Sequence, residues 1–165
     1  MKEMIRIVLL LAVCTALFTG CGGSSESSQE QSLTVYSFSG ENDFISVSNG
    51  VIVLDAENEI CYGGDLKVKP EEFADIAGYS TTIYIDMGSE KEILLSGGVE
   101  DQTGGTIDIP ESPGKISGDI LRDSDTDKLV DNLWFELKTI DLNGEENTYQ
   151  IQLEMTEIME KVIYL

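Results

Sequence analysis

The sequence predicts an all-β fold: a two-sheet antiparallel sandwich, immunoglobulin-like or jelly-roll-like, with one or two short helices. From Leu33 onward, short segments of alternating apolar and polar residues are separated by Gly, Asn, Asp, Ser and Pro. Such alternation is typical of strands with one buried face, and the separating residues favour turns. About 134 residues follow position 31, which suits one domain with a single core.

The expected strands are the segments in which apolar residues alternate or run together between turn residues. They lie at 33–38, 43–48, 51–56, 58–62, 65–69, 80–87, 91–96, 105–109, 115–121, 132–140 and 147–155. Residues 156–165 fit both helical and strand spacing, and we favour a strand there.

Two Asn-Gly pairs indicate hairpins, because opposite residues share a sheet face and should share polarity where that face is buried. At Asn49-Gly50, a two-residue type I′ turn puts Val47 opposite Ile52 and Ile45 opposite Leu54. Both pairs are apolar, so we expect a hairpin at this position.

The second pair, Asn143-Gly144, needs a longer loop. A two-residue turn would put Leu137 opposite Gln150 and so mix core with solvent. A three-residue loop, 142–144, with Gly144 in the left-handed position of a G1 bulge, aligns apolar residues throughout. The predicted pairs, which should form a core stripe, are Leu137 with Tyr149, Phe135 with Ile151 and Leu133 with Leu153.

Helix signals are few. Pro70 is followed by two glutamates, and Gly78 marks a stop, so we expect two helical turns between them. Residues 124–133 should hold one further turn, capped by Ser124 or Asp125.

The N-terminal residues predict an export signal. Lys2 and Arg6 form a small positive region, the largely apolar run 7–18 follows, and Thr19 and Gly20 are small. A bilayer-spanning helix needs about 20 apolar residues, so this run is too short to remain as an anchor. We therefore expect residues 1–20 to be cleaved as a signal peptide.

The residues LFTGC, 17–21, resemble the lipobox of bacterial lipoproteins, in which a small residue precedes a cysteine that is acylated. The family pattern has an aliphatic residue where this chain has Phe18. The resemblance implies that Cys21 becomes the new N-terminus and carries two or more acyl chains, palmitate among them, which anchor it stably. An ordinary secretory signal cut elsewhere is the alternative.

The expected organisation is a signal peptide at 1–20, a lipidated cysteine and flexible tether at 21–31, and one domain at 32–165. The tether is rich in Gly and Ser and has no apolar residue to bury. Stretches 36–54 and 132–153 resemble small, functionally uncharacterised surface lipoproteins of Gram-positive gut bacteria, a resemblance that implies lipidation and a β domain and no known active residues. The domain should therefore lie on the extracellular side of the cell membrane, held there by its lipid.

Composition limits the partners. The formal net charge is −21, from 31 acidic and 10 basic residues. A field of this sign repels nucleic acid and anionic lipid head groups, so we exclude both. A surface protein or a glycan remains as a possible partner beside the membrane that holds the anchor.

Catalytic constellations are scarce. The chain has no histidine, which excludes Ser-His-Asp and Cys-His arrangements and any zinc site that uses His. Cys61 has no activating imidazole, and we interpret it as a small buried hydrophobic residue. A carboxylate-based glycoside hydrolase ranks lowest, so we expect a non-enzymatic binding or interaction domain without an obligatory cofactor.

The acidic stretch before residue 132 is a candidate calcium loop. Asp123, Asp125, Asp127 and Asp131 offer the hard oxygen ligands that calcium prefers. An EF-hand loop requires Gly at the sixth position and Glu at the twelfth, where this chain has Lys128 and Trp134. The EF-hand interpretation therefore fails. An irregular calcium loop remains beside the favoured interpretation, a solvated acidic connector.

Trp134 is the candidate ligand-binding residue. It alternates with Leu133 and Phe135, so it should share the opposite sheet face with Glu136 and Lys138. There it could stack on a sugar ring, or instead cover the edge of the core beneath a loop, which we favour. The second functional hypothesis is accordingly a calcium-stabilised carbohydrate-binding domain.

Overall fold

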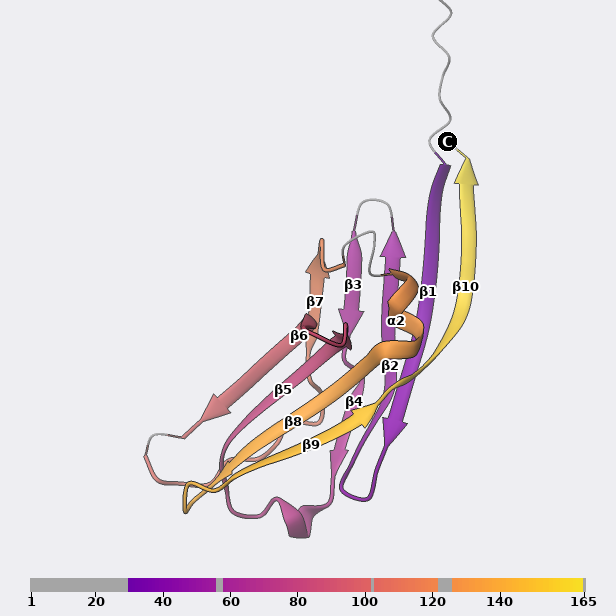
Figure 1. Cartoon of the computed structure of the whole chain (residues 1–165). Coiled ribbons are helices and arrows are strands. Elements are labelled where there is room, and N and C mark those ends of the chain that lie inside the picture. The colour runs from indigo at the N-terminus through magenta and orange to yellow at the C-terminus, as the bar shows by residue number, and fades with distance from the viewer. Residues whose placement is uncertain (1–29, 56–57, 102, 122–125, 165) are drawn as a thin grey trace, which may run out of the picture.

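A computed structural model describes residues 30–55, 58–101, 103–121 and 126–164, and it confirms the predicted two-sheet antiparallel sandwich (Figure 1). The elements are β1 (Glu30–Glu41), β2 (Ile45–Asp55), β3 (Glu59–Tyr62), β4 (Asp65–Val68), η1 (Pro70–Glu72), β5 (Ile76–Asp86), β6 (Lys91–Glu100), β7 (Lys115–Gly118), α2 (Thr126–Asn132), β8 (Leu133–Asp141), β9 (Glu146–Gln152) and β10 (Glu154–Tyr164).

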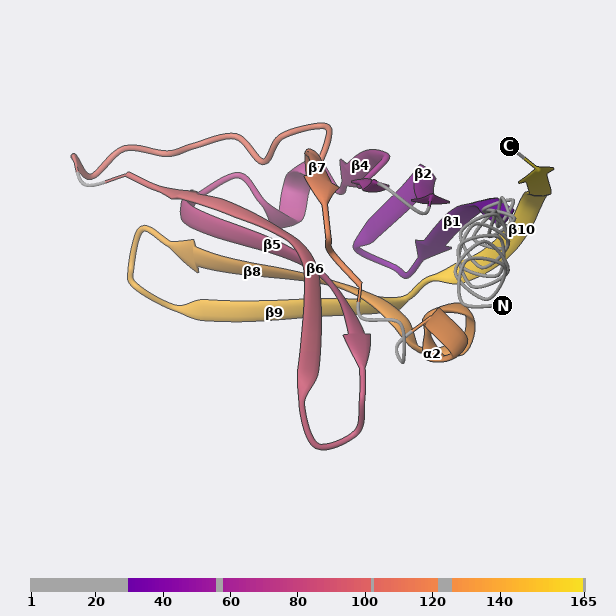
Figure 2. The same ribbon diagram turned by 90° about the horizontal axis from the view of Figure 1, so that it is seen from above.

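The strands form two sheets that cross one another. The first sheet has the order β10-β1-β2-β3-β7, with β4 also paired to β2, and the second sheet has the order β6-β5-β8-β9. Figure 2 shows the strands of the second sheet running across those of the first. The core between the sheets is apolar, and its fully buried side chains include Ile52, Ile83, Leu94, Phe135 and Leu137.

The β8–β9 hairpin has the predicted register. Phe135 pairs with Ile151 and Leu137 with Tyr149, and the backbone N–H of Leu153 donates to the carbonyl oxygen of Leu133 at 2.8 Å. Gly144 has a φ of 82°, and its N–H donates to the carbonyl oxygen of Asp141 at 3.0 Å. The three-residue loop and its left-handed glycine are therefore confirmed, and five residues of the stripe are buried while Tyr149 is half-buried.

The predicted hairpin at Asn49-Gly50 is wrong, because β2 continues through both residues. Asn49 has a φ of 57°, and the register against β1 shifts here, so that Gly40 pairs with Val47 but Phe38 with Gly50. A bulge adds one residue to a strand, so it restores the same alternation of faces that a two-residue turn would produce. The apolar pattern fits both arrangements equally well.

The turn that joins β1 to β2 instead lies at Asn42. Its side-chain oxygen accepts hydrogen bonds from the backbone N–H groups of Phe44 and Ile45, at 2.8 and 3.0 Å. An Asx turn of this kind reverses the chain without glycine. The predicted strands 43–48 and 51–56 are consequently one strand.

Two other predicted elements differ. Residues 105–109 are not a strand but part of the connection from β6 to β7, where the Asp101 carboxylate accepts hydrogen bonds from Thr103 and Gly105 and holds the chain in a local turn. The expected two helical turns after Lys69 shorten to the single 3₁₀ turn η1, because Phe73 turns into the core and is 7% exposed. Helix α2 lies where one turn was expected, and its proposed caps, Ser124 and Asp125, lie outside the described residues.

The chain changes sheets at Leu153. The predicted strand 147–155 divides there into β9, which belongs to the second sheet, and β10, which pairs with β1 and confirms the expected C-terminal strand. A Cβ atom at Gly40 would lie 2.6 Å from the carbonyl oxygen of Gln152, so glycine permits this close crossing. Glu30 pairs with Tyr164, and Figure 1 shows β1 and β10 extending together beyond the other strands.

Candidate functional site

The predicted calcium ligands are only partly described. Asp123 and Asp125 lie outside the described residues, and Asp127 and Asp131 lie in helix α2. Asp131 is exposed, and its carbonyl oxygen accepts a hydrogen bond from the Gln152 side chain at 2.8 Å. The part of the chain that the structure describes contains no group of three or more acidic or cysteine side chains suited to a metal. The calcium loop stays a prediction.

Trp134 lies on the outer face of the second sheet, which we define as the face turned away from the first sheet. Its neighbours across the strands are Tyr84 on β5 and Gln152 on β9. It is half-buried, whereas Leu133 and Phe135 beside it are fully buried between the sheets. The alternation predicted from the sequence is therefore confirmed, and Trp134 shares its face with Glu136 and Lys138.

Glu136 is the unexpected residue of this face, because a carboxylate on the outside of a sandwich should be exposed and this residue is only 7% exposed. One oxygen, Oε2, accepts hydrogen bonds from Lys91 Nζ at 2.8 Å and Gln150 Nε2 at 2.6 Å. The other, Oε1, lies 3.4 Å from Lys138 Nζ. Every oxygen of the buried carboxylate thus has a donor.

Four strands contribute to this cluster. Lys91 comes from β6, Tyr84 from β5, Glu136 and Lys138 from β8, and Gln150 from β9. The ammonium group of Lys91 lies 4.0 Å from the centre of the Tyr84 ring, a cation–π contact, and Gln150 also donates to the Tyr84 hydroxyl at 3.4 Å. We call these five residues the Glu136 cluster.

The protonation state of the cluster argues against acid catalysis. Burial by itself would raise the pKa of Glu136, but the hydrogen bonds from Lys91 and Gln150 outweigh it and the pKa is lowered. The same hydrogen bond raises the pKa of Lys91. A general acid must hold its proton near neutral pH, and Glu136 does not. Glu136 is therefore ionised near neutral pH and is held in place by its partners.

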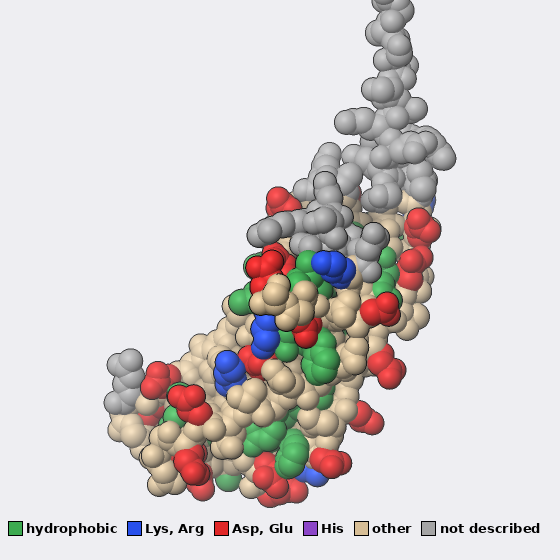
Figure 3. All heavy atoms as spheres, in the orientation of Figure 1, with side chains coloured by type: hydrophobic (Ala, Val, Ile, Leu, Met, Phe, Trp, Pro, Cys, Tyr) green, Lys and Arg blue, Asp and Glu red, His purple; other side chains and the backbone are tan. Residues whose placement is uncertain are grey.

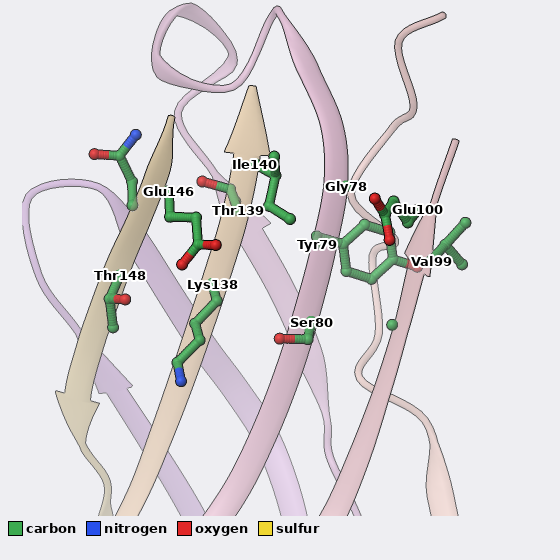
Figure 4. A pocket seen from close by; sticks show the side chains of 12 residues that line it. Gly78, Tyr79, Ser80, Val99, Glu100, Lys138, Thr139, Ile140, Glu146 and Thr148 are labelled. Atoms are coloured by element: carbon green, nitrogen blue, oxygen red, sulfur yellow. The ribbon is translucent and has the colours of Figure 1, made fainter. Parts of the chain in front are cut away.

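A hollow of about 480 Å³ lies further along the outer face. Three consecutive residues from each of the four strands line it, namely 78–80, 98–100, 138–140 and 146–148. Figure 4 shows Ser80, Lys138, Glu146 and Thr148 projecting from β5, β8 and β9. The hollow therefore presents hydroxyl, ammonium and carboxylate groups together.

Two of the residues that line the hollow are glycines. Gly78 and Gly98 add no side chain to the hollow, and a Cβ atom at Gly98 would lie 2.6 Å from the carbonyl oxygen of Tyr79. In the space-filling view, basic and acidic side chains both lie over the second sheet, and further acidic side chains follow the edge along β10 (Figure 3). The outer face of the second sheet therefore carries charges of both signs.

The predicted role of Cys61 is confirmed. Its side chain is 0% exposed, and desolvation by burial raises the pKa of the thiol to about 12. A thiol that remains protonated at neutral pH is a poor nucleophile.

Sequence reasoning placed Trp134, Glu136 and Lys138 on one face but missed the rest of the site. The partners of Glu136 come from β6 and β9, and Lys91 lies 45 positions away in the chain. The local signal for the hollow was the glycine pair Gly97-Gly98 within a predicted strand region, since glycine inside a strand often marks a close approach of a ligand or backbone.

Comparisons with protein-family models, with curated proteins and with solved structures find no match for this chain. Among the described residues, no helix has the length and apolar character needed to cross a membrane. Assignment of the site therefore depends on its geometry.

Proposed function

We propose that the chain is a lipid-anchored protein on the outer side of the bacterial cell membrane, and that its sandwich domain binds a ligand without catalysis on the outer face of the second sheet. The observation that carries the binding role is the Glu136 cluster beside the hollow. A buried, fully partnered charge on an outer face holds polar side chains in fixed positions, and such preorganisation favours binding.

The lipid anchor is supported by the signal-like N-terminus and by Cys21. From Cys21 to Glu30, where β1 begins, the chain advances nine residues. A fully extended segment of this length spans about 30 Å, and a flexible one averages about 15–18 Å. The end of the domain that carries Glu30 would therefore stay close to the membrane.

The hollow would then face outward. It lies where β8 ends and β9 begins, and Figure 1 shows this end of the second sheet opposite the paired ends of β1 and β10. Strand β10, with 11 residues, alone accounts for about 37 Å of separation. An anchored domain would thus display the hollow to the surroundings of the cell.

Substitution of the anchor cysteine tests the localisation. Cys21→Ala should move the protein from the membrane fraction to the soluble fraction, because the acylated thiol is lost. Cys14→Ala is the matched control, since Cys14 lies within the expected signal peptide, and this variant should remain in the membrane fraction. Retention of Cys21→Ala in the membrane would refute the anchor.

A calcium-stabilised carbohydrate-binding domain is the second candidate. The position of Trp134 favours its carbohydrate part, because a half-buried indole on an open face presents a flat apolar surface. Its calcium part depends on Asp123, Asp125, Asp127 and Asp131 and is tested separately below.

A further inference from the structure

We infer that the outer face of the second sheet binds an extended, uncharged glycan chain, which occupies the hollow at one end and contacts Trp134 at the other. This inference rests on the proposed binding function and adds the chemical class of the ligand. It needs no calcium, because every group that it uses belongs to the strands of the second sheet.

The length of the surface suits a chain of several sugar rings. Ile140 lines the hollow and Trp134 lies six residues away on the same face of β8. At strand spacing, six residues correspond to about 20 Å. The exposed side chains of Lys138 and Gln150 lie between them, so polar groups continue from the hollow toward Trp134.

The polar groups match sugar hydroxyls, which both donate and accept hydrogen bonds. In the hollow, the Lys138 ammonium group donates, the Glu146 carboxylate accepts, and the hydroxyls of Ser80 and Thr148 do both. The indole of Trp134 offers an apolar ring surface beyond them. A ligand with hydroxyl groups along its edges and apolar ring faces satisfies both parts of the surface.

Charge disfavours an anionic ligand. Two lysines, Lys91 and Lys138, lie on this face together with four carboxylates, those of Asp86, Glu100, Glu136 and Glu146, so the face has no excess of positive charge. The chain as a whole carries −21, which repels anionic polysaccharides. A neutral chain is not repelled, and it leaves the ion pairs of the Glu136 cluster intact.

A peptide strand fits this face less well. Strands β5 and β8 are paired on both sides, so their backbone groups are already used in the sheet. Peptides that bind as added strands need a sheet edge. Protein interfaces also depend on large aromatic or Arg anchors that become fully buried, and most of the residues that line this hollow are small or polar.

The Glu136 cluster positions the middle of the path. Lys91 and Gln150 hold both Glu136 and the ring and hydroxyl of Tyr84, and Tyr84 lies directly across from Trp134. Fixing these side chains before the ligand arrives reduces the entropy lost on binding.

Affinity electrophoresis of the full chain in detergent micelles tests the inference. The gels contain galactomannan, xyloglucan, laminarin or dextran as neutral probes and polygalacturonate as the anionic one. At least one neutral probe should retard the protein, in calcium and in chelator alike, and polygalacturonate should not. Failure of all four neutral probes, or retardation by polygalacturonate alone, would overturn the inference. The Cys21→Ala fractionation is unaffected by this result, so the anchor is judged independently.

Variants then locate the binding surface. Trp134→Ala and Lys138→Ala should each weaken retardation about tenfold or more, while Lys67→Ala, at an exposed position on β4 of the first sheet, should leave it unchanged. Ser80→Arg fills the hollow from an exposed position, so it should block binding even if Trp134→Ala fails to fold. Normal retardation of Lys138→Ala and Ser80→Arg would show that the ligand binds elsewhere.

Discussion

Replacement of Lys91 by methionine removes the strongest partner of the buried carboxylate and keeps most of the side-chain volume. Lys91 Nζ lies 2.8 Å from Glu136 Oε2, and the lysine side chain is 44% exposed while that of Glu136 is 9% exposed. Hydrogen bonds to charged groups contribute about 1.5–3 kcal/mol, and exposed ion pairs about 0–1 kcal/mol. Solvent around the exposed part of Lys91 weakens this ion pair, and Gln150 still donates to Glu136 in the variant. We therefore expect Lys91→Met to lower the free energy of unfolding by about 1–2 kcal/mol at pH 7.

The effect should depend on pH in a defined direction. The pKa of Glu136 is lowered from its ordinary value of 4.5, so its ionised form stabilises the folded state above that pH. This stabilisation is lost as the pH falls through the lowered pKa, because the protonated carboxyl no longer attracts Lys91. The difference between the wild-type protein and Lys91→Met should therefore be largest near neutral pH and shrink below 4.5.

Urea unfolding of residues 30–165 measures this difference, with fluorescence of the single tryptophan, Trp134, as the signal. Lys67→Met is the control, since Lys67 is exposed on β4 in the other sheet. A stabilising role of the Lys91–Glu136 ion pair is refuted if Lys91→Met is no more destabilising than this control, or if it lowers the free energy of unfolding equally at pH 7 and at acid pH.

Three further predictions test other parts of the account. If the acidic loop binds calcium, millimolar calcium should raise the melting temperature relative to chelator, because a ligand at 100 times its dissociation constant stabilises the folded state by about 2.7 kcal/mol. Asp125→Asn should abolish this shift. No shift in the wild-type protein would mean that the loop is a solvated connector. Thr139→Val should stabilise the domain by about 1 kcal/mol in urea unfolding, because the buried Thr139 hydroxyl has no hydrogen-bond partner among the described residues; destabilisation would argue against this. Cys61 should react with iodoacetamide at pH 8 only after denaturation, since its thiol is fully buried with a pKa of about 12, and rapid labelling of the native protein would contradict that.

Local sequence patterns predicted strand pairing correctly where only one register placed apolar residues on the buried face and polar residues on the exposed face. The β8–β9 hairpin is such a case, because a two-residue turn would have placed Gln150 opposite Leu137 in the core. At Asn49 the same test failed, since a bulge and a turn produce the same alternation of Val47 and Ile52. Only the pairing of β2 with β3 and β4 distinguishes them, and that pairing is not local.

The candidate site follows the same division. Alternation within one strand was enough to place Trp134, Glu136 and Lys138 on a common face. The burial of Glu136 depends on Lys91 and Gln150. These residues lie beside it only because the strands are adjacent in the order β6-β5-β8-β9 within the sheet. Strand order is set by the packing of the whole domain, so no pattern within a short segment predicts the cluster or the hollow.

The central claim is that the outer face of the second sheet is the binding surface, and fluorescence quenching of Trp134 tests it most directly. The chain has one tryptophan, so quenching by acrylamide reports on this face alone. The measurement compares the free protein with the protein saturated by whichever neutral polysaccharide retards it. We expect the bound polysaccharide to shield Trp134 and reduce quenching. Unchanged quenching at saturation would show that the ligand binds another surface and would contradict the account.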